Sequence, residues 1–227
     1  MIRVKFGLHF TPYFPSIPAV MTAFREINPS ANRIFESVLK QVRDDFQIER
    51  KDNLTGLKLL SRFDGLKGYR QLFVHKVTEF KKHSNSFIIL LMEKHLIITE
   101  NKSRYGVFAT QEREIEEIEP LLIFSLQHDV GKVMIKNETL TDKLADLFTK
   151  IDIDFPDYPS FSSNYLVVGE KPELVKKFLP KGLLATLDSI KNMTIEIEGN
   201  WGLLRIEKNL TEDLLLGLIG MGARITK

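Results

Sequence analysis

The clearest hydrophobic pattern in the chain lies between Ser30 and Phe46. Its apolar residues recur three and four positions apart, at Ile34, Phe35, Val38, Leu39, Val42 and Phe46. This spacing is typical of an amphipathic helix with one buried face, and Ser30 is a suitable N-cap. A shorter helix is expected before it, from Ser16. This helix should end at Asn28, because a residue that precedes proline avoids the helical region.

Beyond residue 56 the pattern changes to short apolar segments separated by turn residues, which predicts strands. The expected strands are residues 57–61, 70–80, 87–92, 96–99, 121–126 and 132–135. Residues 87–92 and 96–99 are expected to pair as a hairpin about Glu93 and Lys94, and the first of them is apolar on both faces, which favours the middle of a sheet. The acidic segment 111–119 is expected to be a short helix or a loop.

The last third of the chain predicts alternating strands and helices. After a capping box at Thr139 and a helix to about residue 151, a strand is expected at 165–168 and a helix at 172–179. That helix is interrupted at Pro180 and followed by a second Leu-rich stripe. A final helix is expected from about Thr211.

A hairpin with a definable register precedes the last helix. If Gly199 and Asn200 form its two-residue turn, Ile195 faces Leu204 and the isoleucines share one face. The other, mostly polar face then carries Trp201, the single tryptophan of the chain.

Together these elements predict one α+β domain over residues 1–227, an antiparallel sheet with N-terminal helices and a C-terminal β-α-β-β-α unit. Within it we expect an aromatic strap at 1–15, helices at 16–48, mainly strands at 57–136 and mixed α/β structure at 139–227.

Composition narrows the functional classes. The 227 residues include no cysteine, which excludes disulfides, thiolate metal sites and cysteine nucleophiles. A net charge of +2 gives no bulk attraction to nucleic acid. The longest apolar run, 214–221, has eight residues where a bilayer span needs about 20. With no secretory signal at the start, we expect a cytoplasmic protein that at most associates peripherally with the inner membrane.

No motif for catalysis or metal binding is found. The histidines, which form neither HExxH nor HxH, are His9, His75, His83, His95 and His128. His75 and Glu79 share one face of a predicted strand, but a four-residue separation places them roughly 13 Å apart, too far for one ion. Phosphate-loop and nucleophile-elbow patterns also fail. We therefore expect neither a metal nor a cofactor.

These observations favour a non-catalytic binding or regulatory module that contacts a protein or a membrane surface, with the oligomeric state left open. The candidate binding residues are Phe10, Tyr13, Phe14, Trp201 and Leu203. Packing of the strap and of Trp201 within the domain is the alternative for each. The rival function is a hydrolase whose carboxylates, such as Glu79 or Asp129, act with His75 or His128. A structural subunit of a larger assembly is a third interpretation, suggested by the abundance of Phe.

One segment carries a family resemblance. The sequence Asp-Tyr-Pro-Ser-Phe-Ser-Ser-Asn-Tyr-Leu-Val-Val-Gly-Glu at 157–170 is followed by a helix, a break at Pro180, a Leu-rich helix and a strand pair. This order, strongest over 157–207, resembles a bacterial family of uncharacterised proteins known as a domain of unknown function. The resemblance implies an α+β domain, often anchored to the membrane in relatives, and brings no catalytic residues.

The membrane interpretation of the strap predicts that the full chain floats with liposomes whereas a chain lacking residues 1–15 does not. Flotation at low and moderate salt measures this. If neither protein floats and both remain folded, the strap is no membrane element.

Overall fold

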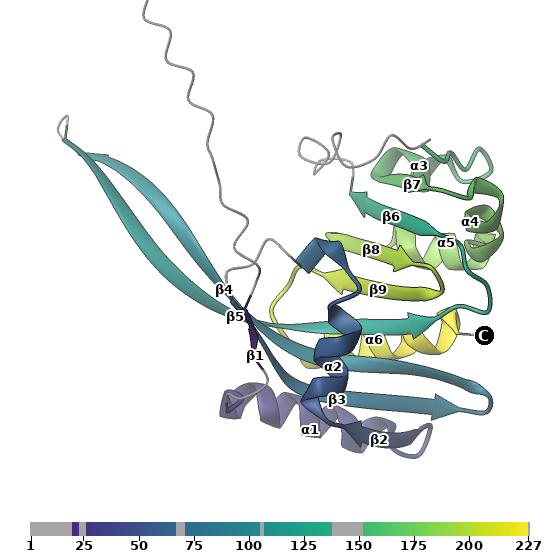
Figure 1. The fold of residues 1–227 in the computed structure, drawn as a ribbon, viewed down its shortest axis with the longest axis horizontal. Coiled ribbons are helices and arrows are strands. Elements are labelled where there is room, and N and C mark those ends of the chain that lie inside the picture. Colours follow the sequence, from purple (N-terminus) through teal and green to yellow (C-terminus); the bar gives the residue numbers. More distant parts are fainter. Residues whose placement is uncertain (1–19, 23–25, 67–70, 105–106, 138–151, 227) are drawn as a thin grey trace, which may run out of the picture.

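In the described part of the chain, one sheet of nine strands forms the centre of the fold, and eight of these strands follow one another edge to edge (Figure 1). The computed structural model describes residues 20–22, 26–66, 71–104, 107–137 and 152–226. The strands are β1 (Val20–Thr22), β2 (Gln47–Lys51), β3 (Gln71–Lys82), β4 (Asn85–Arg104), β5 (Val107–Ser125), β6 (Lys132–Asn137), β7 (Tyr165–Gly169), β8 (Met193–Glu198) and β9 (Trp201–Ile206). They run in the order β1-β3-β4-β5-β9-β8-β6-β7, and β2 also pairs with β3. Strands β1 and β3 pair in parallel, and the other pairs of these strands are antiparallel.

Helices cover both faces of this sheet (Figure 1). They are α1 (Pro29–Val42), α2 (Asn53–Leu60), the 3-10 turn η1 (Asp64–Leu66), α3 (Pro159–Asn164), α4 (Pro172–Phe178), α5 (Lys181–Asp188) and α6 (Glu212–Ile225). The predicted α+β class is confirmed. The C-terminal unit consists of β7, the α4–α5 pair, β8, β9 and α6, as the sequence indicates.

Two apolar cores lie on the two faces of the sheet. The larger packs α1 and α3–α6 on one side, which we call the α6 face, and it contains Phe87, Ile89 and Leu91 of β4. The smaller packs α2 and η1 on the other side, the α2 face, and contains Leu90 and Met92. The β4 run that is apolar on both sides lies in the middle of the sheet, between β3 and β5, as predicted. Because successive strand residues point to opposite faces, its side chains enter both apolar cores.

Several local expectations hold. The α1 stripe is buried at Phe35, Val38 and Val42, although Asn28, whose side chain accepts from the Ser30 amide at 2.9 Å, is the N-cap instead of Ser30. The C-terminal hairpin has the predicted register, which is Met193↔Ile206, Ile195↔Leu204 and Ile197↔Gly202. Helix α6 begins after Thr211, which accepts from the Leu214 amide.

The expected strand at 57–61 is wrong, because residues 57–60 belong to helix α2 and Ser61 is its C-cap. The Asp52 side chain caps the helix by accepting from the Thr55 amide at 2.8 Å. Gly56, Leu59 and Leu60 are then buried against the sheet at helical spacing. An eight-residue helix on a sheet needs only one apolar stripe, which a short Leu-rich run does not distinguish from a strand.

Two further expected helices lie partly or wholly outside the described residues. The helix expected from Ser16 is wrong at Val20–Thr22, which form strand β1 beside β3. Residues 16–19 and 23–25, and the helix expected from Thr139 to residue 151, lie outside the part of the chain that the structure describes.

The expected hairpin about Glu93 and Lys94 is also wrong. Strand β4 runs unbroken from Asn85 to Arg104 through both residues, and the acidic segment 111–119 is part of β5, its antiparallel partner. Charged residues indicate a turn when they are solvated, but Glu93 and Lys94 are buried at 4% and 6% exposure. Their partners on neighbouring strands stabilise them there.

Two glycines of α6 should respond in opposite ways to substitution by alanine. A Cβ at Gly222 would lie 2.4 Å from a ring carbon of Phe87, whereas a Cβ at Gly217 meets nothing within 4 Å. Gly222→Ala should lower the free energy of unfolding by about 1–3 kcal/mol through overpacking. Gly217→Ala should raise it by about 0.5–1 kcal/mol through helix propensity. Urea denaturation measures both, and equal effects would contradict this packing of α6.

Candidate functional site at the base of the β4–β5 arm

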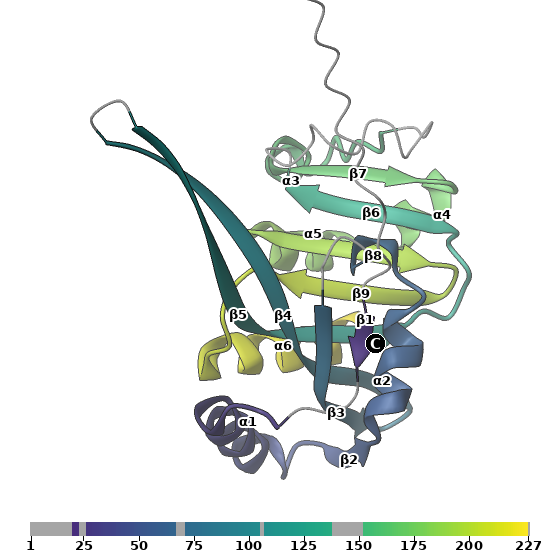
Figure 2. The ribbon, with the colours of Figure 1, turned by 60° about the vertical axis from the view of Figure 1, so that its left-hand side comes forward.

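Strands β4 and β5 extend well beyond their neighbours. Strand β3 pairs with β4 as far as His95, and β9 pairs with β5 from Leu121 onward. Residues 96–104 and 107–115, which we call the arm, pair only with each other among the described strands. Nine residues a strand correspond to a ribbon of about 30 Å, and Figures 1 and 2 show it projecting from the body of the protein.

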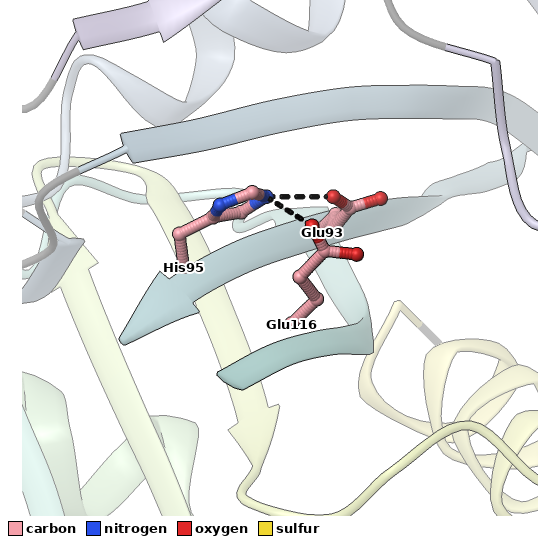
Figure 3. Close-up of side chains that lie close together, drawn as sticks. All are labelled: Glu93, His95 and Glu116. Atoms are coloured by element: carbon pink, nitrogen blue, oxygen red, sulfur yellow. Dashed lines mark hydrogen bonds and ion pairs between the residues drawn. The ribbon is translucent and has the colours of Figure 1, made fainter. Parts of the chain in front are cut away.

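A cluster of two histidines and two glutamates lies at the base of the arm. Nε2 of His95 is 2.8 Å from Oε1 of Glu93 and 3.8 Å from Oε1 of Glu116. Nε2 of His75 is 2.9 Å from the other carboxylate oxygen of Glu93, Oε2. In Figure 3 both glutamates point toward the same ring nitrogen of His95. We refer to these four residues as the His/Glu cluster.

Strand register brings the cluster together. Glu93 and His95 are two positions apart on β4 and therefore share a face. His95 lies directly opposite Glu116 of β5. His75 joins them through a β-bulge, since Val74 pairs with Met92 and Lys76 with Leu91, which leaves His75 as the extra residue.

Because of the bulge, His75 and Glu79 do not share one face of the strand, contrary to the expectation from the sequence. Beyond the bulge Glu79 lies opposite Ile88, which packs on the α2 face. There its carboxylate is 3.1 Å from Nζ of Lys51 and 3.1 Å from Nζ of Lys81. His75 instead contacts Glu93 on the opposite side of the sheet.

Burial divides the cluster into an inner and an outer part. The side chains of His75, Glu93 and His95 are 1%, 5% and 8% exposed, whereas that of Glu116 is 53% exposed. The Phe73 ring lies 5.2 Å from the His95 ring. A buried carboxylate needs hydrogen-bonded or charged partners to offset its desolvation. Each carboxylate oxygen of Glu93 lies within hydrogen-bond distance of a histidine Nε2. Solvent reaches the group from the side of Glu116.

A second charged cluster occupies the α2 face of the same strands. Glu119, whose side chain is 1% exposed, lies 3.0 Å from Nζ of Lys94 and 3.3 Å from Nε of Arg205. Lys94 also lies 3.1 Å from the half-exposed Glu117. Nη1 of Arg205 donates to the Gly65 carbonyl at 3.3 Å. These contacts link β4, β5, β9 and the η1 turn.

Glu196 of β8 continues this network. It accepts hydrogen bonds from the amides of Asp64 and Gly65 at 2.6 and 2.9 Å. Desolvation raises the pKa of Glu196 above its ordinary value. The η1 turn is thus anchored to the sheet by two charged side chains, Glu196 and Arg205.

The other residues of the hydrolase hypothesis are placed elsewhere. His128 is exposed and lines a hollow of about 320 Å³ together with Phe178 of α4 and Ile225 of α6. Asp129 lies 2.9 Å from Nζ of Lys171, whose hydrogen bond lowers the pKa of that carboxyl.

The candidate binding residues fall into two groups. Leu203 is 1% exposed within the smaller core, and Trp201 is partly buried against it with the Arg62 guanidinium 5.4 Å from its ring centroid. Phe10, Tyr13 and Phe14 lie outside the described residues. A binding role for these five residues stays a prediction.

The sequence did not reveal the His/Glu cluster, because the pattern that would indicate it covers only a few residues. Glu93 and His95 alternate on one strand, opposite Glu116, but the sequence pattern places a turn between them. A continuous β4 would have indicated the shared face. The contribution of His75 depends on the bulge, for which the sequence has no marker.

Comparisons with known proteins identify no family for this chain. No protein-family model and no curated protein matches the sequence. The structure resembles the mycobacterial trehalose monomycolate transport factor A with a TM-score of 0.48 at 9% identity, covering 88% of this chain and 94% of that one. At these values the similarity carries no functional argument. Among the described residues, no helix combines the length and apolarity that crossing a bilayer requires. Membership of the uncharacterised bacterial family and a cytoplasmic location stay predictions.

The α2-face cluster predicts unequal effects of two neighbouring neutral substitutions. Glu119→Gln leaves Lys94 and Arg205 buried without their shared carboxylate, and should lower the free energy of unfolding by about 3–5 kcal/mol. Glu117→Gln removes a half-exposed partner of Lys94 and should cost at most about 1 kcal/mol. Chemical denaturation at neutral pH measures both, and similar losses would show that Glu119 does not hold this cluster together.

Proposed function

We propose that the protein is a non-catalytic binding module whose arm engages an extended, basic segment of a partner protein by strand addition. The observation that carries this proposal is the arm itself, a ribbon that leaves the sheet at the Leu96↔Ile115 pair. The proposal favours a protein contact over a membrane surface.

The physical argument rests on the edges of the ribbon. A two-stranded ribbon is marginally stable by itself, and each unpaired edge presents backbone N–H and C=O groups that can bind another strand. Proteins usually shorten or cover such edges, whereas this one extends two of them for nine residues each. Main-chain hydrogen bonding to an added strand supplies affinity for an extended peptide.

The charge of β5 suggests the chemistry of the partner. Residues 112–117, which span the base of the arm, contain four glutamates and one arginine, whereas Glu119 beyond them is buried against Lys94 and Arg205. Of the four, Glu116 is largely exposed and Glu117 half-buried in the structure. Such a segment attracts a basic peptide and repels anionic lipid headgroups.

The His/Glu cluster favours binding over hydrolysis. Three of its four side chains are less than a tenth exposed, so a substrate would reach only the rim at Glu116. Catalytic groups must come within hydrogen-bond reach of the reacting atoms.

An arm-shortened variant tests the proposal. Because Leu96 lies opposite Ile115, residues 97–114 can be replaced by an Asn-Gly turn that closes the hairpin. Partners captured from the native cells by the full chain should be lost with this variant. For a partner reconstituted from purified components, amide hydrogen exchange in residues 107–115 should slow on binding, and affinity should fall as salt rises.

A charge reversal with a matched control distinguishes the effect of the acidic segment of β5 from that of the overall charge of the protein. Glu114→Lys, a change within the arm and outside the His/Glu cluster, should weaken binding of the reconstituted partner, whereas Glu173→Lys, the same charge reversal at an exposed position of α4, should leave it unchanged. Undiminished partner binding by the folded arm-shortened variant would overturn the proposal. Binding to anionic vesicles that requires the arm would replace the protein partner by a membrane.

A further inference from the structure

We propose that Glu93, His95 and Glu116 form a binding site for a divalent transition-metal ion, with Zn²⁺ the best fit, and that His75 orients Glu93 from outside the coordination shell. The site shares Glu116 with the acidic segment of β5, but its metal binding does not require the partner proposed for the arm. It uses residues of two strands, β4 and β5, that the sequence alone did not connect.

The spacing of the donor atoms suits one ion. One ligand atom from each of Glu93, His95 and Glu116 lies within 4.8 Å of the other two. Ligands bound at about 2.0–2.1 Å in a tetrahedral shell are roughly 3.3–3.4 Å apart. The observed Nε2–O distances of 2.8 and 3.8 Å fall on either side of that value. Small side-chain rotations would therefore accommodate the ion.

His75 supplies the outer contact that protein metal sites commonly use. Its Nε2 is 2.9 Å from Oε2 of Glu93, while Oε1 of the same carboxylate faces His95. A hydrogen bond to the second oxygen fixes the plane of the carboxylate and directs Oε1 toward the ion. The β-bulge that inserts His75 into β3 thus has a role in this arrangement.

The donor types narrow the choice of metal. One imidazole and two carboxylates, without thiolate, favour Zn²⁺, with Mn²⁺ or Fe²⁺ next, over the all-oxygen sites of Ca²⁺ and Mg²⁺. Two carboxylates close together on one face repel each other, and a divalent cation between them removes that repulsion. Three protein ligands also leave a fourth position for water on the exposed side of Glu116.

The position of the site gives the ion a structural consequence. Glu93 and His95 belong to β4 and Glu116 to β5, at the point where β3 ends its pairing with β4. A bound ion would join β4 and β5 at the point beyond which β3 no longer pairs with β4. It would therefore brace the base of the arm.

Metal titration of the full chain tests the site. The metal-free protein, titrated with Zn²⁺ by calorimetry, should bind one equivalent saturably, and Co²⁺ should give a visible absorption spectrum that Zn²⁺ abolishes. Glu116→Gln should weaken Zn²⁺ binding at least tenfold. Glu117→Gln is the matched control, because Glu117 pairs with Lys94 on the opposite face, and it should leave the affinity unchanged.

Variants of the inner residues complete the test. His95→Asn should abolish the Co²⁺ spectrum, and His75→Gln should weaken Zn²⁺ binding by about 10–100-fold through the loss of the outer contact. His128→Asn, an exposed histidine elsewhere, should have no effect. If the buried substitutions prevent folding, the exposed Glu116→Gln still decides the matter. Failure of the wild-type chain to bind one ion below roughly 100 µM, or equal binding by Glu116→Gln and Glu117→Gln, would overturn the proposal.

Discussion

The continuous ladder between β4 and β5 is the constraint on which the other elements depend. It runs from the Phe87↔Phe124 pair to the Arg104↔Val107 pair. Its inner half receives β3 on one edge and β9 on the other, and its two faces carry the two apolar cores. Among the described strands, none but its own partner pairs with the outer half, which forms the arm. One pair of strands therefore provides both the centre of the fold and its most exposed feature.

Charged residues mark the boundary between these halves. At the end of the body the alternation of β4 places Glu93 and His95 on the α6 face and Lys94 on the α2 face, each with partners on neighbouring strands. Burying a charge is favourable only where such partners compensate its desolvation. The two charged clusters thus specify the register at which the arm leaves the sheet, since a one-residue slip would exchange the faces and separate every pair.

This arrangement connects the proposed binding function with the proposed metal site. An arm that engages a partner needs a defined direction at its base, which the Lys94–Glu119–Arg205 contacts supply on one face. The His/Glu cluster occupies the corresponding place on the other face, and an ion there would link the two strands directly. The body is otherwise held by apolar packing on both sides of the sheet.

The sequence by itself determined the elements whose signal is local. The α1 stripe, the hairpin register around Gly199 and the start of α6 at Thr211 follow from periodicity, turn chemistry and capping within a few residues. Tertiary structure decided what depends on distant partners. Residues 57–60 became helical on a sheet that buries one side of them, and Glu93 remained in a strand because His75, from another strand, meets its carboxylate. Long-range pairing determines whether a charged residue is solvated or buried, and a linear pattern carries no record of that pairing.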